Sequence, residues 1–399
     1  MSDVLDWLER ISELFILKLL TLGAWSKAYE QHRTIKYYED YLHDKTIDEL
    51  INIYGRIIDE YLHIQVVDES IMMTTYWLDP NWNNRKKHEI IGSTFGSLVD
   101  YQIKIIVHYG SGVDSGEHVY LNGKCRPDFA DIRFTLGDGT TLLPYWMESK
   151  VDYNYAVFWV KLPSILVYPN ITYIYVYYNN MNASTISNGA NTFDFFTDMI
   201  DGSGIIYNKA SFSGGECILS PNGSQPASYV RREVKVGYYH AFRVRSKWYN
   251  EYGAWKEQGF GWTDWTGQTP NYYENALLVG TNIYTDGAIV YRYFSNGEYR
   301  FMVGNTSGST YVVISFGWAG DYHILEIRAF PSVIRFALDD DVKASITSNL
   351  PPLGVTMNQQ IGWYQYAGSG RQYIDWFLIR KYVEPEPAHG SWGDEETKP

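Results

Sequence analysis

The spacing of hydrophobic residues changes once along the chain, from a helical period in residues 1–66 to an alternating period from Ile71 onward. In the first segment, Thr46-Ile47-Asp48-Glu49 forms a capping box, and an apolar stripe follows at three- and four-residue steps as far as Leu62. A break at Gly23 and an aromatic cluster at residues 37–42 divide this segment further. We therefore expect residues 1–66 to form a helical segment.

These helices have little core of their own, because a segment of this length buries only a modest fraction of its surface. Their apolar faces therefore need a partner. One alternative is a private helical bundle that caps the β domains. The other, which we favour, is a segment that mediates oligomerisation or anchoring.

From Ile71 onward the pattern is that of β-strands. In residues 101–108, the apolar residues Tyr101, Ile103, Ile105 and Val107 alternate with Gln102, Lys104, Ile106 and His108, as in a half-buried strand. Gly137-Asp138-Gly139 predicts a hairpin turn, and the run of β-forming residues at 173–178 predicts a strand buried on both faces. Many short strands with turn signals between them predict an antiparallel β-sandwich over residues 71–198.

Residues 199–383 repeat this pattern and predict a second antiparallel, jelly-roll-like sandwich. Its strands are expected at residues 241–246, 288–294, 299–303, 311–316, 323–330, 333–338 and 374–381. Asn296-Gly297 marks a hairpin between two of them. Residues 384–399, which contain prolines and a Gly-Ser-Trp-Gly run, are predicted to be an extended tail. The fold class is thus mainly β, with a helical N-terminal segment.

Composition agrees with this fold and limits the partners. Aromatic residues are 17% of the 399 residues, with 36 Tyr, 14 Trp and 34 Gly, which is typical of strands joined by tight turns. The formal net charge of −13 disfavours a nucleic-acid partner. Cys125 and Cys217 are too few for a disulfide framework or a tetrahedral zinc site, and they form either one bridge or two buried thiols.

The N-terminus lacks the features of an export signal. Its first ten residues include Asp3, Asp6 and Glu9, whereas a signal peptide begins with a basic region. The apolar run at residues 14–22 is much shorter than the roughly 20 residues that a membrane span needs. We therefore expect neither a signal peptide nor a membrane span.

Several ordered landmarks between Trp82 and Phe196 resemble one family. They are Asp100-Tyr101-Gln102-Ile103, Ala130-Asp131-Ile132-Arg133-Phe134, Leu143-Pro144-Tyr145-Trp146-Met147-Glu148, Phe158-Trp159-Val160-Lys161-Leu162-Pro163, Ile174-Tyr175-Val176-Tyr177-Tyr178-Asn179, and Asn188-Gly189 with Thr192-Phe193. Their order and spacing resemble the DUF2341 family over about residues 79–198. Residues 334–341 and 375–382 resemble the concanavalin- or laminin-G-like sandwich that usually follows such a module.

This resemblance implies a β-rich module of archaeal and bacterial surface proteins, and it names no reaction. It favours an archaeal source. Within the module, we expect Asp131 and Arg133 to hold a strand edge or turn by ion pairing, and Glu148 to be a salt-bridge partner. Trp146 and Trp159 are predicted core residues.

No catalytic set is found in the sequence. Concanavalin-like sandwiches that cleave glycans need two carboxylates about 5–10 Å apart, and no Glu-x-Asp-x-x-Glu pattern occurs. Asp339-Asp340-Asp341 offers oxygen ligands that could bind Ca²⁺, although a plain acidic turn explains it as well. The histidines are dispersed. We therefore expect a protein that is not an enzyme and needs no cofactor.

The densest aromatic region is the candidate binding surface. Aromatic residues interrupted by glycines fill residues 248–273, and flat rings on such loops give large contact areas to sugars or proteins. The candidate partner-binding residues are Tyr252, Trp255, Trp262 and Trp265. The alternative is that these rings fill the core of the second sandwich.

The preferred interpretation is a structural protein of a virion or extracellular assembly, such as a capsid, turret or fibre subunit with possible adhesion to a host surface. Its partners would be further copies of the chain, joined through residues 1–66, or other virion proteins, with a host glycan as a further partner. The first alternative is a cell-surface carbohydrate-binding protein. The second is a glycan-cleaving enzyme on a concanavalin-like fold.

Overall fold

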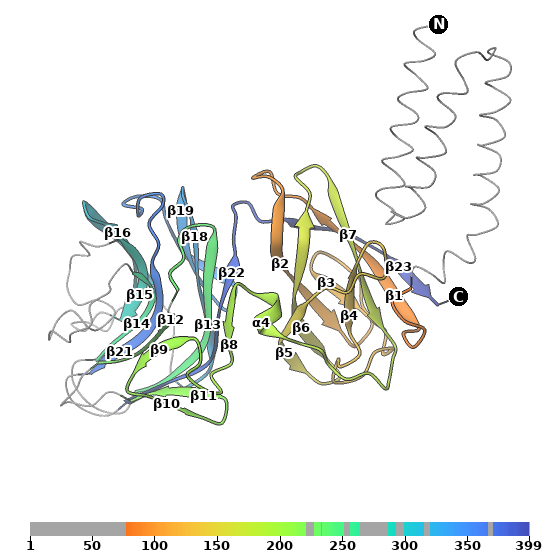
Figure 1. Cartoon of the computed structure of the whole chain (residues 1–399), viewed down its shortest axis with the longest axis horizontal. Coiled ribbons are helices and arrows are strands. Elements are labelled where there is room, and N and C mark those ends of the chain that lie inside the picture. Colours follow the sequence, from red (N-terminus) through yellow and green to blue (C-terminus); the bar gives the residue numbers. More distant parts are fainter. Residues whose placement is uncertain are drawn as a thin grey trace, which may run out of the picture.

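The computed structural model describes residues 77–220, 227–232, 234–250, 256–263, 286–292, 299–314, 320–365 and 370–398. Within these ranges the chain is almost entirely β, in four sheets that form two sandwiches (Figure 1). The predicted β architecture is therefore confirmed. The predicted helical segment, residues 1–66, lies outside the described residues, and its role in oligomerisation or anchoring stays a prediction.

The first sandwich consists of sheet A, in the order β23-β1-β7-β4, and sheet B, in the order β3-β2-β6-β5. Its strands are β1 (Asn84–Ile91), β2 (Leu98–His108), β3 (His118–Tyr120), β4 (Arg133–Leu136), β5 (Tyr145–Val151), β6 (Tyr155–Ile165), β7 (Ile171–Tyr178) and β23 (Ala388–Thr397). A single helical turn, α4 (Gly189–Thr192), follows β7 and is capped by the side chain of Asn188.

The alternation predicted for β2 is present. Ile103, Ile105 and Val107 lie in the core between the two sheets, and the alternate residues Lys104, Ile106 and His108 are half-buried on the other face. The predicted turn after β4 is also present, because the carboxylate of Asp138 accepts hydrogen bonds from two backbone N–H groups there. β7 is buried on both faces from Ile174 to Tyr178.

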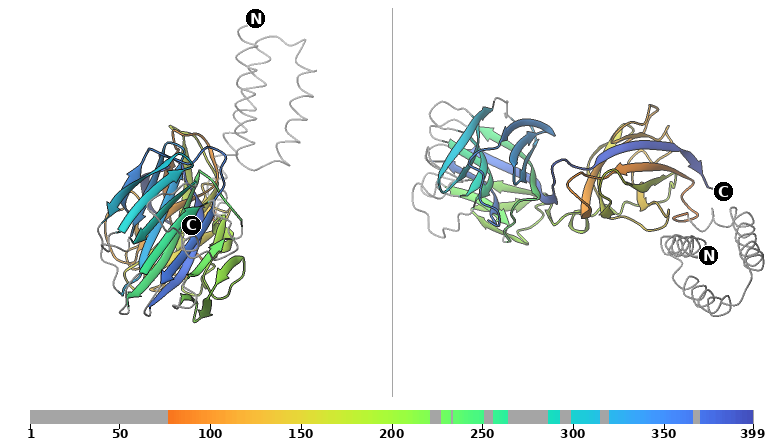
Figure 2. Two further views of the ribbon diagram at one scale, coloured as in Figure 1. Left: turned by 90° about the vertical axis from the view of Figure 1, so that its left-hand side faces the viewer. Right: turned by 90° about the horizontal axis from the view of Figure 1, so that it is seen from above.

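The predicted tail is wrong. Residues 388–397 form β23, which pairs antiparallel with β1 and is the edge strand of sheet A. Figure 2 shows the two strands running side by side along the first sandwich. The sequence of β23 is rich in small and charged residues, so it resembles a tail locally, but its pairing with β1 and the inward-facing Trp392 hold it in place.

A histidine pair lies at this seam. His88 Nε2 on β1 is 2.8 Å from His389 Nδ1 on β23, and the His88 ring stacks on Trp392 at a centroid distance of 3.7 Å. Burial, together with the neighbouring His389, lowers the pKa of His88 to about 3. Burial lowers the pKa of His389 to about 4. The pair is therefore neutral at neutral pH.

The second sandwich consists of sheet C, in the order β10-β11-β22-β13-β18-β19-β20 with β8 also on β22, and sheet D, in the order β17-β16-β15-β14-β21-β12-β9. Its strands are β8 (Phe195–Thr197), β9 (Ile205–Asn208), β10 (Ala210–Ser213), β11 (Glu216–Leu219), β12 (Ala227–Arg232), β13 (His240–Asn250), β14 (Lys256–Thr263), β15 (Gly287–Arg292), β16 (Tyr299–Asn305), β17 (Gly308–Ile314), β18 (His323–Phe330), β19 (Val333–Leu338), β20 (Asp341–Ile346), β21 (Asn358–Gln365) and β22 (Gly370–Lys381).

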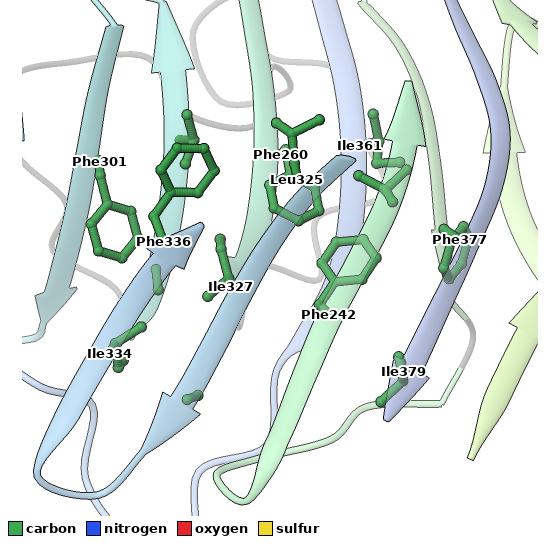
Figure 3. Close-up of a cluster of buried hydrophobic side chains, with 14 of the residues drawn as sticks. Phe242, Phe260, Phe301, Leu325, Ile327, Ile334, Phe336, Ile361, Phe377 and Ile379 are labelled. Carbon is green, nitrogen blue, oxygen red and sulfur yellow. The ribbon is translucent and has the colours of Figure 1, made fainter. Parts of the chain in front are cut away.

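The core of this sandwich lies between sheets C and D. Phe242 and Phe336 of sheet C meet Phe260 and Phe301 of sheet D, with ring centroids 4.6 and 5.9 Å apart in the two pairs (Figure 3). Each predicted strand of the second region overlaps an observed one, and the predicted bounds of β18 and β19 match the structure. The Asn296-Gly297 turn lies outside the described residues.

The boundary between the sandwiches lies earlier than residue 198. Phe195–Thr197 form β8, which pairs with β22 of sheet C and so belongs to the second sandwich. The chain therefore leaves the first sandwich near Asp194 and returns to it after Lys381 to form β23. The whole second sandwich is inserted between two parts of the first.

The four sheets are arranged in the order A, B, C and D across the long dimension of the molecule (Figure 1). Sheets B and C face each other across the junction of the two sandwiches. Each therefore covers part of the outer face of the other. Cys125 and Cys217 are buried free thiols in the separate cores. Among the described residues, no helix is long and apolar enough to cross a bilayer.

Candidate functional site

The junction between the sandwiches is built around aromatic side chains from both. Trp146 and Trp159 of sheet B pack with Trp376 and Leu378 of β22 and with Phe193, which precedes β8. Trp146 contacts Trp376 edge-on at a centroid distance of 5.1 Å. The prediction that Trp146 and Trp159 are buried is therefore confirmed, and their burial depends on the second sandwich.

Ion pairs surround this aromatic cluster. Arg243 on β13 donates two hydrogen bonds of 3.0 Å to the carboxylate of Glu148 on β5, across the junction. A third nitrogen of Arg243 lies 2.6 Å from Asp340. Glu148 also accepts a hydrogen bond of 2.8 Å from the indole of Trp159. The predicted salt-bridge role of Glu148 is thus confirmed.

A second set of ion pairs lies beside the first. The buried carboxylate of Glu326 on β18 is 2.7 Å from Arg380 and 2.7 Å from Arg328. Arg380 also pairs with Glu386 in the return segment, 2.7 Å away, and Tyr101 of β2 donates to the same carboxylate.

The carboxylates of Glu326 and Asp340 have lowered pKa values and are held in the charged form. Burial alone would raise the pKa of Glu326, but the charges of Arg328, Arg380 and Arg243 outweigh burial and lower it well below its usual value. Burial would also raise the pKa of Asp340, but the charges of Arg243 and Lys104 outweigh burial and lower it. A general acid for glycoside cleavage needs a raised pKa, so the converging carboxylates of the junction fit a structural role.

Asp131 and Arg133 are also structural, but they act through hydrogen bonds to backbone groups and not through the predicted ion pairing. The buried carboxylate of Asp131 accepts backbone N–H groups of Arg126, Asn179 and Asn180 at 2.9–3.2 Å. Arg133 donates to backbone carbonyls, including that of Ser184 at 2.6 Å. Both side chains therefore join loops that border β4 and β7, because backbone groups rather than opposite charges lie within reach.

The three adjacent aspartates lie at the turn from β19 to β20, and each contacts a basic side chain. Asp339 lies 2.7 Å from His323, Asp340 pairs with Arg243, and Asp341 lies 2.5 Å from Lys343. In the described ranges, no group of three or more His, Cys, Asp or Glu side chains is arranged to hold a metal ion. The Ca²⁺ site remains a prediction, with its oxygen atoms used in ion pairs here.

The outer face of sheet D carries an unusual strip of glycines. Gly259 and Gly261 on β14, Gly362 on β21, Gly287 on β15 and Gly304 on β16 each flank a core residue, so they occupy outward positions. Gly259 lies directly opposite Gly362, and Gly287 lies opposite Gly304. Glycine is disfavoured within strands and often marks a place where a ligand or another backbone approaches closely.

Arginine and tyrosine side chains stand on both sides of this strip. On β12, the guanidinium of Arg231 lies 6.0 Å from the ring of Tyr229. On the far side, the guanidinium of Arg300 on β16 lies 4.5 Å from the ring of Tyr311 on β17. Tyr311 is 50% exposed. The face therefore combines two cross-strand glycine pairs with arginine and tyrosine side chains, and its outward residue Met302 is buried.

The aromatic residues proposed from the sequence are not the ones that define this face. Tyr252, Trp255 and Trp265 lie outside the described residues, and only the backbone of Trp262, in β14, is described. Their role in binding stays a prediction. Sequence reasoning treated Gly259 and Gly261 as loop residues, whereas both lie inside β14. The available signal was the alternation Gly-Phe-Gly-Trp, which has the period of a strand.

The family comparison matches the part of the first sandwich from β4 to β7 and the beginning of the second sandwich. Residues 128–204 match the model of DUF2341, a domain of unknown function. The chain contains a DUF2341 module. In this DUF2341 module, Asp131 and Arg133 join loops, and Trp146, Glu148 and Trp159 face the second sandwich. No curated protein matches the chain.

Solved structures with a similar fold include glycan-active and carbohydrate-recognising proteins. A β-glucanase of Bacillus licheniformis is 16% identical, with 47% of this chain and 98% of that chain covered and a TM-score of 0.36. The metal-free carbohydrate recognition domain of Emp46p is 10% identical, covering 49% and 96%, with a TM-score of 0.39. A β-1,3-glucanase from Mycobacterium marinum is 10% identical, covering 48% and 99%, with a TM-score of 0.35. At these identities and TM-scores, the likeness assigns no activity to this chain.

Proposed function

We propose that this chain is a carbohydrate-binding protein and that the glycan lies on the outer face of sheet D. The observation that carries the proposal is the glycine strip, with Gly259 opposite Gly362 and Gly287 opposite Gly304 on neighbouring strands. Each glycine pair removes the side chains from two neighbouring strands at the same level of the sheet. Backbone packing does not require it, since valine or isoleucine would stabilise the same strands better.

The side chains beside the strip have the chemistry that sugars need. An exposed tyrosine ring such as Tyr311 offers a flat apolar surface to the C–H groups of a sugar ring. Arg231 and Arg300 offer planar donors to hydroxyl or carboxylate oxygens. The opposite face of this sandwich is occupied at the junction by the first sandwich. The outer face of sheet D is therefore the better candidate for a ligand.

The test is binding of the full-length protein to a panel of immobilised neutral and acidic polysaccharides. Gly362→Val places a side chain opposite Gly259 and should abolish binding while the thermal unfolding transition is preserved. Gly393→Val is the matched control, because it adds the same side chain to the outer face of sheet A, where the nearest atom would be 3.4 Å away. Equal binding by the two variants would exclude the glycine strip as the site.

A second pair of variants tests the tyrosine. Tyr311→Ala should weaken binding, and Tyr173→Ala should not, although both residues are exposed strand tyrosines that lie beside a basic side chain. An equal effect of both substitutions on binding would contradict the proposed site.

We further propose a second function, assembly of several copies into a virion or extracellular structure. The observation that favours it is β17, one of the two edge strands of sheet D as described. It exposes Tyr311, Val312 and Val313, with no charged residue between Gly308 and Ile314 to discourage pairing with another chain. Deletion of residues 1–66 should abolish assembly if that segment drives it, and light scattering that is unchanged by the deletion would argue against that role.

A further inference from the structure

We infer that β23 is an acid-released strand: protonation of His88 and His389 detaches it from β1 while the rest of both sandwiches stays folded. The two imidazoles contact each other across the strand pair, with His88 Nε2 2.8 Å from His389 Nδ1. One of these nitrogens must lack a proton to accept the hydrogen bond of the other. Protonation of both rings places an N–H on each of the facing nitrogens and brings two positive charges into contact.

The surroundings of His88 leave little room for added charge. Its side chain is completely buried, and Trp392 of β23 covers its ring at a centroid distance of 3.7 Å. Its Nδ1 lies 3.2 Å from the carbonyl oxygen of Ser391. On β1, Lys86 lies on the same face as His88 and is already paired with Asp114, 2.6 Å away. A buried imidazolium here would have no counter-ion of its own, which is costly.

Charged groups from three neighbouring elements act on His389. They are Lys104 on β2, Glu117 and His118 at the start of β3, and Glu386 in the return segment. Glu117 lies 3.1 Å from Lys104, and Glu386 lies 2.7 Å from Arg380, so both carboxylates already have a cation. These charges oppose one another, and burial remains the main reason that His389 stays neutral.

β23 is otherwise held mainly by its pairing with β1. Its ten residues occupy exposed and half-buried positions only, and Trp392 is the residue through which it packs against the core. As an edge strand of sheet A, it is paired on one side. That pairing is irregular, with a register shift on each side of His88. Segments with few buried apolar contacts open at a lower free energy than the whole domain, so β23 can leave first.

Detachment need not disturb the junction between the sandwiches. The return segment is fixed as far as Glu386, whose carboxylate pairs with Arg380 and accepts a hydrogen bond from Tyr101. The residues of β23 begin after this point, at Ala388. The strand can therefore separate from β1 while the ion pairs of the junction stay in place.

The trigger lies at mildly acidic pH. A released imidazole has the ordinary pKa of 6.5, whereas the paired strand holds the pKa of His88 at about 3 and that of His389 at about 4. The detached state therefore binds protons that the paired state does not, so pairing is strongest above pH 6.5 and weakens as the pH falls. Between pH 7 and pH 5, the ratio of detached to paired strand should rise about 20-fold for each imidazole, and by roughly several hundred-fold for both.

The test is hydrogen–deuterium exchange of the full-length protein at pH 7 and pH 5, corrected for the intrinsic exchange rate. Protection of residues 388–397 should fall by about 100-fold or more, while β6 and β13 keep their protection. The double variant His88→Asn/His389→Asn has no imidazole to protonate, so its β23 should lose this pH dependence whatever its protection at pH 7. His240→Asn, in the second sandwich, is the control and should retain the full pH dependence.

The outcomes are distinct. Equal loss of protection in β6, β13 and β23 at pH 5 would mean that acid unfolds the molecule as a whole, which overturns the inference. Unchanged protection of β23 at pH 5 would overturn it as well. Full pH dependence in the double variant would show that other groups release the strand and that the histidine pair does not control it.

Discussion

The outer faces of sheets A and D carry the same kind of side-chain pair in different surroundings. On sheet A, the guanidinium of Arg85 lies 4.0 Å from the ring of Tyr175 and 4.4 Å from that of Trp77. Its Nε lies 2.7 Å from Glu396, and the side chain is buried. On sheet D, Arg231 lies beside Tyr229 but has neither a carboxylate partner nor a covering indole among the described residues.

The strands near the arginine differ between the two sheets as well. β7 of sheet A reads Ile-Thr-Tyr-Ile-Tyr-Val-Tyr-Tyr, so every outward position near Arg85 carries a side chain. Sheet D has glycines at the corresponding central positions. An arginine–tyrosine pair therefore stabilises the fold where other groups complete its contacts, as they do around Arg85. Three predictions test this distinction.

The largest effect is expected for Arg243, which is fully buried and pairs with the buried carboxylates of Glu148 and Glu326. Arg243→Gln leaves Glu148, Glu326 and Asp340 without their shared cation at the junction. It should lower the free energy of unfolding by about 3–5 kcal/mol, because uncompensated buried charges are costly. Arg126→Gln, which breaks a half-exposed pair with Asp128, should have a much smaller effect. Denaturant titration measures both, and equal midpoints would mean that water reaches the junction.

The next effect is expected at the histidine seam of sheet A. The pKa values of His88 and His389, at about 3 and about 4, lie below the ordinary value of 6.5. The unfolded chain therefore binds protons that the folded chain does not, and stability falls as the pH decreases below about 6.5. Between pH 7 and pH 5 the loss should be about 2 kcal/mol for each imidazole.

Unfolding midpoints at the two pH values check this prediction. A His389→Asn variant removes one of the two titrating groups, so its stability should fall by a smaller amount over the same interval. A variant with the same pH dependence as the wild type would assign the acid sensitivity to other groups.

The smallest effects compare the two sheet faces directly. Arg85→Gln removes a charged hydrogen bond to Glu396 and a bond to Tyr177, and it should cost about 1.5–3 kcal/mol of stability. Arg231→Gln should change stability by less than about 0.5 kcal/mol, because no ion pair is lost. Thermal unfolding of both variants under one condition measures the difference. A large loss in Arg231→Gln would reveal a structural role for that side chain.

Local patterns were sufficient to predict much of the fold. The alternation in residues 323–330 and 333–338 gave the bounds of β18 and β19, because these strands have one face in a core. Local patterns failed for β23, whose small and charged residues are held by pairing with a strand from the other end of the described chain. They also failed for β14, because Gly259 and Gly261 were interpreted as loop residues. Pairing with β21 keeps both glycines in an extended strand.

The candidate site was harder to predict for a related reason. Residues Glu326 and Arg380 look like solvent-facing positions in alternating strands, yet both are buried on the face of sheet C that the first sandwich covers. The opposite holds for sheet D, where the glycines gain meaning only through cross-strand register. Gly259 and Gly362 are far apart in sequence, and no local pattern places them opposite each other.

The insertion of one sandwich into the other has a consequence for biosynthesis. Asn84 of β1 and its partner Thr397 of β23 are separated by 313 positions in the sequence. A ribosome completes every strand of the second sandwich before it produces β23, so sheet A remains one strand short during that time. β1 then presents an unpaired edge on the nascent chain, which is the kind of edge that recruits other extended chains. We expect this interval to be when the growing polypeptide is most exposed to aggregation and most dependent on chaperones.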